Sequence, residues 1–205
     1  MEQSTHIKQI YNSRVNLLDM LEDDSFDISN YKGESIEEVN TMNQNDQLDM
    51  LIQKKEKKLY IKYHLAKTIR PQYIYEYIED IFTIEEILNK NDDLVIISKD
   101  NINDTITKLL KKIWSDDGIF IRIINIKALQ FNILKHELVP KHRVLNEKET
   151  LEFNKKYNIT DIRQIPDISR FSPVSLIIGI RPGEICEITR YTPTTINTLF
   201  YRVCI

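Results

Sequence analysis

The sequence predicts an α/β protein in two parts: an α/β layer domain in residues 1–133 and a small α+β module in residues 134–205 that closes with an antiparallel hairpin. In the first part, strand-like and helix-like segments alternate, which favours a layered α/β fold. In the second, two apolar segments flank a turn-rich stretch. The charge balance also changes there, from 17 Lys and Arg against 23 Asp and Glu in residues 1–133 to 11 against 8 in residues 134–205.

An amphipathic helix is expected first, because Ser4 suits a helix cap and the apolar residues after it recur every three or four positions. The acidic run 22–24 ends it, since negative charge opposes the carbonyl end of the helix dipole. The segment that follows, to about Lys58, is polar, and a loop tip is expected at NQND, residues 43–46. Its one helix signal is Ser35 with Glu38, a capping box.

The next segment alternates between strand and helix patterns. From Leu59, apolar residues fall at every second position, which predicts a strand. Pro71 suits the first turn of a helix, and Thr83 with Glu86 forms the capping-box pattern of another helix. A second strand is expected at residues 94–98.

The clearest helix pattern follows Asp104, the expected cap, and its apolar residues recur at helical spacing as far as Trp114. Gly118 is expected to end this helix. The β-branched run from Ile119 to Leu134 predicts one long strand or a tight pair of strands.

The second part begins with HELVPKH, residues 136–142, which we expect to run extended, with Pro140 excluded from a central strand. Asn146 with Glu149 is expected to begin a helix that continues to about Tyr157.

A short helix is expected to open at Pro173 and end at Gly179, and Gly183 marks a turn. Strands at residues 185–190 and 199–204 are expected to pair in antiparallel fashion and close the module.

The pattern of this second part resembles one known family, which comprises the H-type subunit of archaeal RNA polymerase and the fifth subunit shared by the eukaryotic nuclear RNA polymerases. The matching positions beyond HELVPKH are Leu145, Glu149, Tyr157, Ile165, Pro166, Ile168, Pro173, Val174, Gly179, Arg181, Gly183, Ile188, Arg190, Tyr201 and Arg202. The archaeal relative consists of this block alone, and eukaryotic relatives add an amino-terminal domain, so the chain resembles the eukaryotic form. Its Ile- and Asn-rich composition and divergent first half suggest a copy carried by a large cytoplasmic DNA virus of the asfarvirus kind, located in the host cytoplasm and the virion.

The resemblance implies a non-catalytic polymerase subunit in which residues 1–133 form a jaw-like domain. Residues 134–205 would form the assembly module that docks on the largest subunit. The positions it implies for docking or architecture are His136, Pro140, Lys141, His142, Arg181, Gly183, Arg190, Tyr201 and Arg202. It further implies that the first domain lies near downstream duplex DNA, where Lys108, Lys111 and Lys112 would contact phosphates without reading sequence. Without the resemblance, these lysines are solvated surface that complements a helix dipole.

The sequence departs from the family pattern at three places. Ser172 stands where an Asp is expected before Pro173, and it remains a competent helix cap. Pro182 stands where an Arg is expected. The glycine-containing loop of the hairpin is replaced by residues 194–196, so contacts made by the hairpin tip are not carried over.

Motif searches leave little room for catalysis, and no catalytic residue, metal, cofactor or small-molecule substrate is assigned. The patterns of nucleotide-binding loops and of the serine nucleophile elbow are absent from the sequence. The spacing of HELVPKH does not fit a helical zinc-protease motif, and Cys186 with Cys204 is too small a set for a disulfide framework or a zinc site, so buried reduced thiols are expected. No apolar run is long enough to span a membrane, which predicts a soluble intracellular chain.

Three alternatives remain open. One is a stand-alone DNA-binding protein, which the acidic balance of residues 1–133 disfavours because phosphate binding requires Lys and Arg. The second is an adaptor that works without a polymerase. The third is a metal-dependent nuclease, for which Glu56 and Lys58 are the nearest candidates, although a solvated charge run explains them better.

Overall fold

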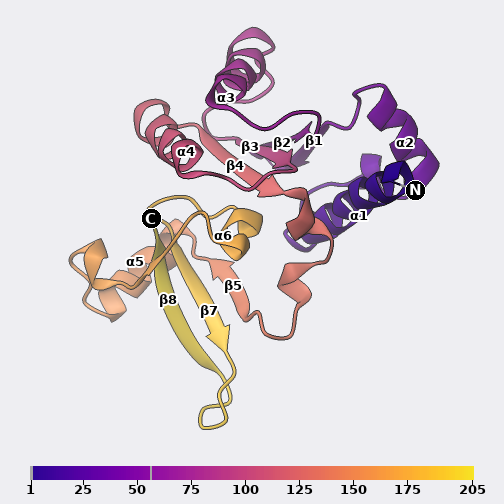
Figure 1. The fold of residues 1–205 in the computed structure, drawn as a ribbon. Helices are drawn as coiled ribbons and strands as arrows, with labels where there is room; N and C mark the ends of the chain where they lie inside the picture. Colours follow the sequence, from indigo (N-terminus) through magenta and orange to yellow (C-terminus); the bar gives the residue numbers. More distant parts are fainter. Residues whose placement is uncertain (1, 56) are drawn as a thin grey trace. The chain divides into compact units, whose positions relative to one another are not determined.

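The computed structural model describes residues 2–55 and 57–205. The chain divides into two compact units, Met1–Asn132 and Ile133–Ile205, called unit 1 and unit 2 below. Each unit contains a four-stranded sheet of its own together with helices (Figure 1). The predicted α/β class is therefore confirmed. Within the described ranges, no helix combines the length and apolar character needed to cross a membrane.

The sheet of unit 1 is mixed, with three parallel strands and one antiparallel edge strand. Its members, in spatial order, are β1 (Met50–Lys54), β2 (Lys57–His64), β3 (Asp93–Ser98) and β4 (Phe120–Asn125). Every residue of β3 is buried. A strand buried on both faces is typical of a parallel sheet covered by helices on each side.

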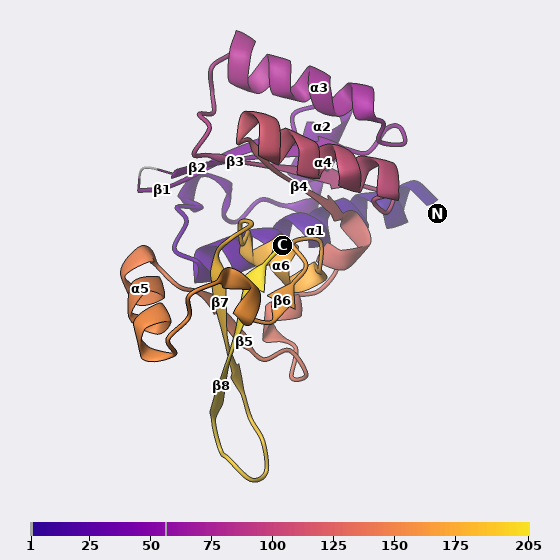
Figure 2. The ribbon, with the colours of Figure 1, turned by 90° about the vertical axis from the view of Figure 1, so that its left-hand side faces the viewer.

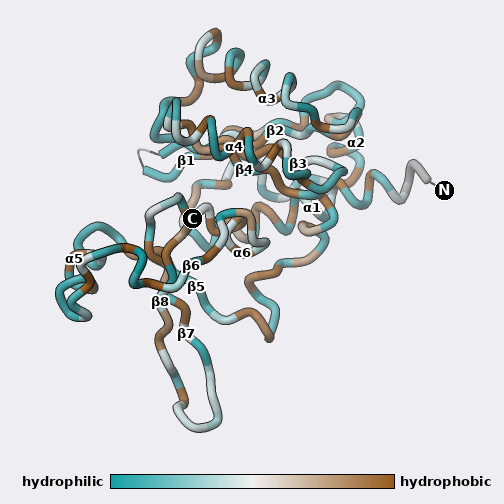
Figure 3. Tube along the Cα trace, turned by 60° about the vertical axis from the view of Figure 1, so that its left-hand side comes forward, coloured by the Kyte–Doolittle hydropathy of each residue, from teal (hydrophilic) through white to brown (hydrophobic). Residues whose placement is uncertain are grey.

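Four α-helices surround this sheet: α1 (Glu2–Asp23), α2 (Ile36–Gln44), α3 (Pro71–Ile78) and α4 (Asp104–Asp117). Figure 2 views the sheet close to edge-on, with α3 and α4 on one side and α1 on the other. The hydropathy colours in Figure 3 agree, since brown residues concentrate along the central strands while the helices alternate between brown and teal. Unit 1 is thus a three-layer arrangement whose parallel strands are joined by helical crossovers.

The polar segment before Lys58 contains more structure than its composition predicts. The capping box is confirmed, because Glu38 N donates to Ser35 Oγ over 3.3 Å and Ser35 N donates to the Glu38 carboxylate over 2.7 Å. Strand β1 was not predicted, because its five residues run directly into a lysine-rich turn. The first helix also begins at Glu2, so Ser4 lies inside it rather than at its cap.

Two further predicted helix starts in unit 1 were wrong. Thr83 opens no new helix, because α3 continues into a π-helical turn, Glu79–Ile84, and Glu86 has a left-handed φ of 49°. The cap of α4 is Asn103 rather than Asp104, since Ile106 N donates to Asn103 Oδ1 over 2.9 Å. The end of α4 is confirmed at Gly118, whose φ of 71° is the left-handed conformation that glycine adopts without strain.

The run after Ile119 is not one long strand. Strand β4 ends at Asn125, whose side-chain oxygen accepts a 2.8 Å hydrogen bond from Lys127 N and begins a 3₁₀ turn, Ile126–Leu129. Asn16 of α1 then donates to the Leu129 carbonyl over 2.9 Å. Packing against α1 therefore replaces strand pairing in this segment, and a further 3₁₀ turn, Ile133–Lys135, opens unit 2.

Unit 2 is built around a second four-stranded sheet, in the order β5, β7, β8, β6. Its elements are β5 (Lys141–Val144), α5 (Glu147–Lys156), β6 (Asp167–Ile168), α6 (Pro173–Ile178), β7 (Ile185–Arg190) and β8 (Thr198–Cys204). The antiparallel pairing of β7 with β8 confirms the predicted closing hairpin. The expectation that HELVPKH is extended holds only from Lys141, because Val139 N donates to the His136 carbonyl and closes a turn.

The predicted caps of unit 2 are confirmed. Asn146 and Glu149 form a reciprocal capping box at the start of α5, and Tyr157 is its C-cap. Ser172 caps α6, and Gly179 ends that helix at a φ of 73°. Strand β6 was not predicted, because two residues are too few to show a period.

Unit 1 contains a buried ionic contact beneath α1. The Arg14 side chain is 2% exposed and pairs with the Glu34 carboxylate, with Nη2 donating to Oε1 over 2.9 Å. Its Nη1 also donates to the Leu48 carbonyl over 2.7 Å. One guanidinium thus fixes α1 to two separate loop segments, and its planar fork suits this better than an ammonium would.

We predict that Arg14→Ala lowers the free energy of unfolding of unit 1 by about 3–5 kcal/mol, because it leaves the Glu34 carboxylate largely buried without its counter-ion. Hydrogen exchange of the unit 1 amides measures the effect. The exposed Arg70 gives a matched control, since Arg70→Ala should cost less than about 0.5 kcal/mol. Equal effects of the two variants would contradict this account of Arg14.

Candidate functional site

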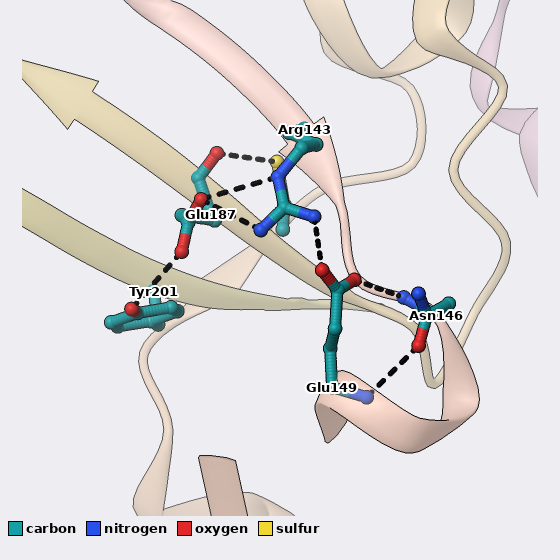
Figure 4. A network of polar contacts seen from close by, with 6 residues as sticks. Arg143, Asn146, Glu149, Glu187 and Tyr201 are labelled. Carbon is teal, nitrogen blue, oxygen red and sulfur yellow. Dashed lines mark hydrogen bonds and ion pairs between the residues drawn. The ribbon is translucent and has the colours of Figure 1, made fainter. Parts of the chain in front are cut away.

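A polar network on one face of the unit 2 sheet has the Glu187 carboxylate at its centre (Figure 4). Arg143 on β5 donates from Nε and Nη2 to Glu187 Oε1, over 3.2 and 3.0 Å. Tyr201 on β8 donates from its hydroxyl to the other carboxylate oxygen over 3.1 Å. Because Glu187 lies on the central strand β7, its two oxygens connect three neighbouring strands.

The same network continues into helix α5. Arg143 Nη1 donates to Glu149 Oε1 over 2.6 Å, and the other oxygen of Glu149 accepts from Asn146 N over 2.9 Å. Figure 4 shows the Arg143 guanidinium between the two carboxylates, one from the sheet and one from the helix cap. The capping box of α5 is therefore coupled to the sheet by a charged side chain.

The pKa values of these groups are shifted by the contacts of the network. Burial raises the pKa of the Tyr201 phenol to about 12, and the hydrogen bond to Glu187 adds to the effect. The backbone bond from Asn146, followed by the Arg143 side chain, lowers the pKa of the Glu149 carboxyl. Hydrogen bonds to both carboxylates raise the pKa of Arg143. The network is thus charged at neutral pH, and salt screens its exposed arginine contacts.

Aromatic rings cover one end of the network. The Tyr201 ring lies 4.5 Å from the Phe153 ring of α5, measured between centroids, and 5.8 Å from the Tyr157 ring. These rings pack next to a small apolar cluster of Leu145, Ile165, Ile185 and Val203. Tyr201 therefore has a structural role in joining α5 to the sheet.

The residues predicted for docking divide between the two faces of this sheet. Lys141 shares a face with Arg143, Glu187 and Tyr201, because cross-strand pairs in the register place these residues on alternate positions. The opposite face carries His142, Arg190 and Arg202, with Phe200 between them. His136 and Pro140 precede β5, and Arg181 and Gly183 precede β7. The predicted set is therefore not one contiguous cluster of side chains.

His142 is fixed as a particular tautomer. Its Nδ1 lies 2.6 Å from the Pro140 carbonyl oxygen, and a carbonyl only accepts, so Nδ1 carries the proton. Burial lowers the pKa of His142, with nearby Arg190 acting in the same direction against the Pro140 bond. The imidazole is consequently neutral at neutral pH and contributes no charge to the surface.

Several residues that were predicted for docking make contacts that stabilise the fold of unit 2. The φ of Gly183 is 91°, and its N–H donates to the Cys204 carbonyl over 2.9 Å. Arg202 Nη1 donates to the Asp167 carbonyl of β6 over 2.8 Å. The Arg190 guanidinium lies 5.0 Å from the centre of the Phe200 ring, a cation–π distance. Of these, Arg190 has the most exposed charge.

The hairpin itself exposes apolar side chains that sequence reasoning missed. Tyr191 and Ile196 near the tip are 75% and 74% exposed, and Leu199 and Phe200 on β8 are 51% and 40% exposed. The available signal was an apolar and aromatic run in residues 188–205 that contains two arginines and no acidic residue. Exposed apolar residues that lie together are typical of an interaction surface.

In unit 1, the three lysines predicted to lie near DNA are brought together. Lys108, Lys111 and Lys112 are all exposed on α4, at helical spacings that place them on one face. Lysines earlier in the chain, in residues 54–58, have a different role. Lys54 pairs with Asp24 at 2.9 Å and Lys57 with Asp93 at 2.8 Å, so both make contacts within the unit.

The nuclease alternative gains no support from the acidic residues of unit 1. Asp92 accepts hydrogen bonds from Lys58 N and Asn89 N, both over 2.7 Å, so its carboxylate satisfies backbone donors of a turn. Among the described residues, no three His, Cys, Asp or Glu side chains are grouped so as to hold a metal ion. Glu56 lies outside the described residues.

The two cysteines are buried free thiols, as predicted. Burial raises the pKa of the Cys186 thiol and raises the pKa of the Cys204 thiol to about 11. Both belong to a second small apolar cluster, with Ile180 and Ile188. They are therefore core residues of unit 2 and poor nucleophiles.

Comparison with known proteins gives consistent matches over unit 2. A family model described as RNA polymerase Rpb5, C-terminal domain, matches residues 131–204. DNA-directed RNA polymerase subunit Rpo5 of Thermococcus kodakarensis is 42% identical over 76 residues, which are 37% of this chain and 92% of the relative. Rpo5 of Staphylothermus marinus is 45% identical over 71 residues, 35% of this chain and 77% of the relative.

A longer match is found to a eukaryotic relative. The subunit rpabc1 of DNA-directed RNA polymerases I, II and III from Dictyostelium discoideum is 30% identical over 111 residues, which are 54% of this chain and 56% of the relative. Because unit 2 is shorter than this match, the similarity extends into unit 1.

We predict that Glu187→Gln lowers the free energy of unfolding of unit 2 by about 1 kcal/mol, because it removes the charge that Arg143 and Tyr201 share at a partly exposed site. The pKa of Tyr201 should fall below about 12 in this variant, since the carboxylate helps to raise it. Hydrogen exchange and tyrosine titration measure the two effects. Glu152→Gln, at an exposed position on α5, is the control, and a Tyr201 pKa unmoved in both variants would contradict the network.

Proposed function

The chain belongs to the family of RNA polymerase subunits that includes archaeal Rpo5 and eukaryotic Rpb5, and on this premise we propose that it is a non-catalytic subunit that docks on the largest subunit of a polymerase through unit 2. The observation that carries the proposal is the extent of the match. The family model covers residues 131–204, nearly the same residues as unit 2. The Rpo5 subunit of Thermococcus kodakarensis, for example, is matched over 92% of its own length.

The structure supports this assignment of roles between the units. The sheet of unit 2 is held by its own network and apolar clusters, so the unit has the elements of an independent docking module. Its hairpin exposes apolar residues together with Arg190. A partner that covers such a surface would add to the stability of a unit with a small core.

For unit 1 we propose a position near downstream duplex DNA, as the jaw-like part of the subunit. The support is the exposed lysine face of α4, Lys108, Lys111 and Lys112, which is suited to phosphates and reads no sequence. The acidic balance of the unit means that these contacts assist an assembled polymerase and do not bind DNA independently.

We also propose a source for the chain in a large cytoplasmic DNA virus, with the protein in the host cytoplasm and the virion. The support is compositional, namely the Ile- and Asn-rich sequence and the weaker resemblance of residues 1–133 to the family.

We predict that residues 133–205 copurify with the largest polymerase subunit and that residues 1–132 do not, when each is expressed with it separately. The reason is that the family match and the exposed hairpin both lie in unit 2. Circular dichroism establishes that each fragment is folded before the comparison. Retention of the first fragment, with loss of a folded second fragment, would move the docking surface to unit 1.

We predict that reversing Lys108, Lys111 and Lys112 to Glu weakens polymerase complexes on downstream DNA, and that the slope of log K against log salt becomes shallower by about two to three, as about 0.9 per lost phosphate contact implies. Salt-dependent dissociation of assembled complexes measures this. The matched control reverses Lys32, Lys67 and Lys90, which lie elsewhere on unit 1. An unchanged slope would leave the α4 lysines as plain surface.

A further inference from the structure

Strand β8 has one edge that is only partly paired. Along its inner edge it pairs with β7 from Thr198 to Val203. Along its outer edge the two-residue strand β6 pairs only with Val203 and Cys204. Among the described residues, therefore, no strand pairs with the outer edge of β8 from Thr198 to Arg202 (Figure 1).

The backbone groups that face this open edge can be identified from two hydrogen bonds. Val203 N donates to the Pro166 carbonyl over 2.9 Å, on the β6 side, whereas Cys204 N donates to the Glu184 carbonyl over 2.9 Å, on the β7 side. Because backbone groups alternate in direction along a strand, the N–H and C=O of Leu199 and Tyr201 point to the open edge. Those of Phe200 point to β7.

The side chains beside the edge are suited to a polypeptide. Leu199 and Phe200 project to opposite faces of β8 and are 51% and 40% exposed, so an added strand would gain apolar contacts on both faces. Proteins commonly protect exposed strand edges with lysine, proline or bulges. Residues 198–202 contain neither lysine nor proline.

The positive charge of the hairpin favours an acidic polypeptide partner over a second copy of this chain. Residues 188–205 contain Arg190 and Arg202 and no acidic side chain. Arg202 is engaged with the Asp167 carbonyl, which leaves Arg190 beside Phe200 as the exposed charge next to the edge. Two copies of this chain paired edge to edge would bring like charges together, whereas an acidic segment would be attracted.

We propose that the outer edge of β8 at Leu199–Tyr201 receives an extended, acidic segment of the partner polypeptide as an additional strand in line with β6. Main-chain hydrogen bonds to Leu199 and Tyr201 provide the affinity, and contacts to Leu199, Phe200 and Arg190 provide the selectivity. The inference rests on the proposed function, because it takes the partner to be the largest polymerase subunit.

Hydrogen exchange of the full chain, alone and in complex with the largest subunit, tests the proposal directly. The amides of Leu199 and Tyr201 should exchange fast in the free chain and be slowed at least about a hundredfold in the complex. The amide of Phe200 should already be slow in the free chain, because it bonds to β7. If the complex forms but the Leu199 and Tyr201 amides still exchange fast, the proposed docking is retained and the added strand is ruled out.

Two substitutions of Leu199 distinguish the contribution of its backbone N–H to binding from that of its side chain. Leu199→Pro removes the outward N–H without touching a bond to β7, and it should weaken binding at least about tenfold, the equivalent of one hydrogen bond. Leu199→Thr keeps the N–H and the strand propensity and should weaken binding less than about threefold. Equal affinity of the proline variant and the wild type would overturn the proposal.

Two further outcomes are distinguishable. If the wild-type chain fails to bind the largest subunit at all, the proposed function fails and the added strand fails with it. If the Leu199 and Tyr201 amides are slowed at high concentration of the chain alone, a second copy occupies the edge and the acidic partner is excluded. Arg190→Glu should weaken partner binding about tenfold and Arg190→Lys less than about threefold, and equal binding by both would exclude an acidic segment.

Discussion

The strands of unit 2 are connected through the Glu187 carboxylate, whose contacts supplement a small apolar core. Two buried apolar clusters among its described residues contain four residues each. Small chains bury a lower share of their surface, and each remaining contact therefore matters more. Glu187 meets Arg143 with one oxygen and Tyr201 with the other, so a single side chain connects β5, β7 and β8. Arg143 extends the connection to the cap of α5.

Unit 1 is stabilised by a larger apolar core and contains a buried ionic contact. Its parallel strands are covered by helices on both sides, and β3 is buried throughout. Arg14 then determines where the loops below α1 lie, because its guanidinium has a carboxylate and a carbonyl to satisfy. The net stability gained from such a pair is small, since desolvation offsets most of the attraction between the charges, although loss of one partner is costly. The polar contacts of unit 2 are more exposed and are therefore more sensitive to salt.

Local signals in the sequence predicted the elements whose ends are fixed by neighbouring residues. The capping boxes at Ser35 and Asn146 and the glycine ends at Gly118 and Gly179 all involve groups within four positions of each other. The predictions failed where contacts between residues far apart in the sequence determine the local structure. The Leu129 turn replaces a predicted strand because Asn16, far away in the chain, donates to its carbonyl.

The docking residues that we propose show the same division between local and distant information. The family pattern identified Arg190 and Tyr201 as important, but it did not separate residues that face a partner from residues that hold the sheet. Only the register makes this separation, because it places Tyr201 against Glu187 and Phe153 while leaving Leu199 and Phe200 exposed. Along β8 the side chain of Tyr201 therefore serves the fold, while its backbone faces the open edge. Side-chain identity and backbone direction carry independent information on a strand, and a sequence pattern records only the first.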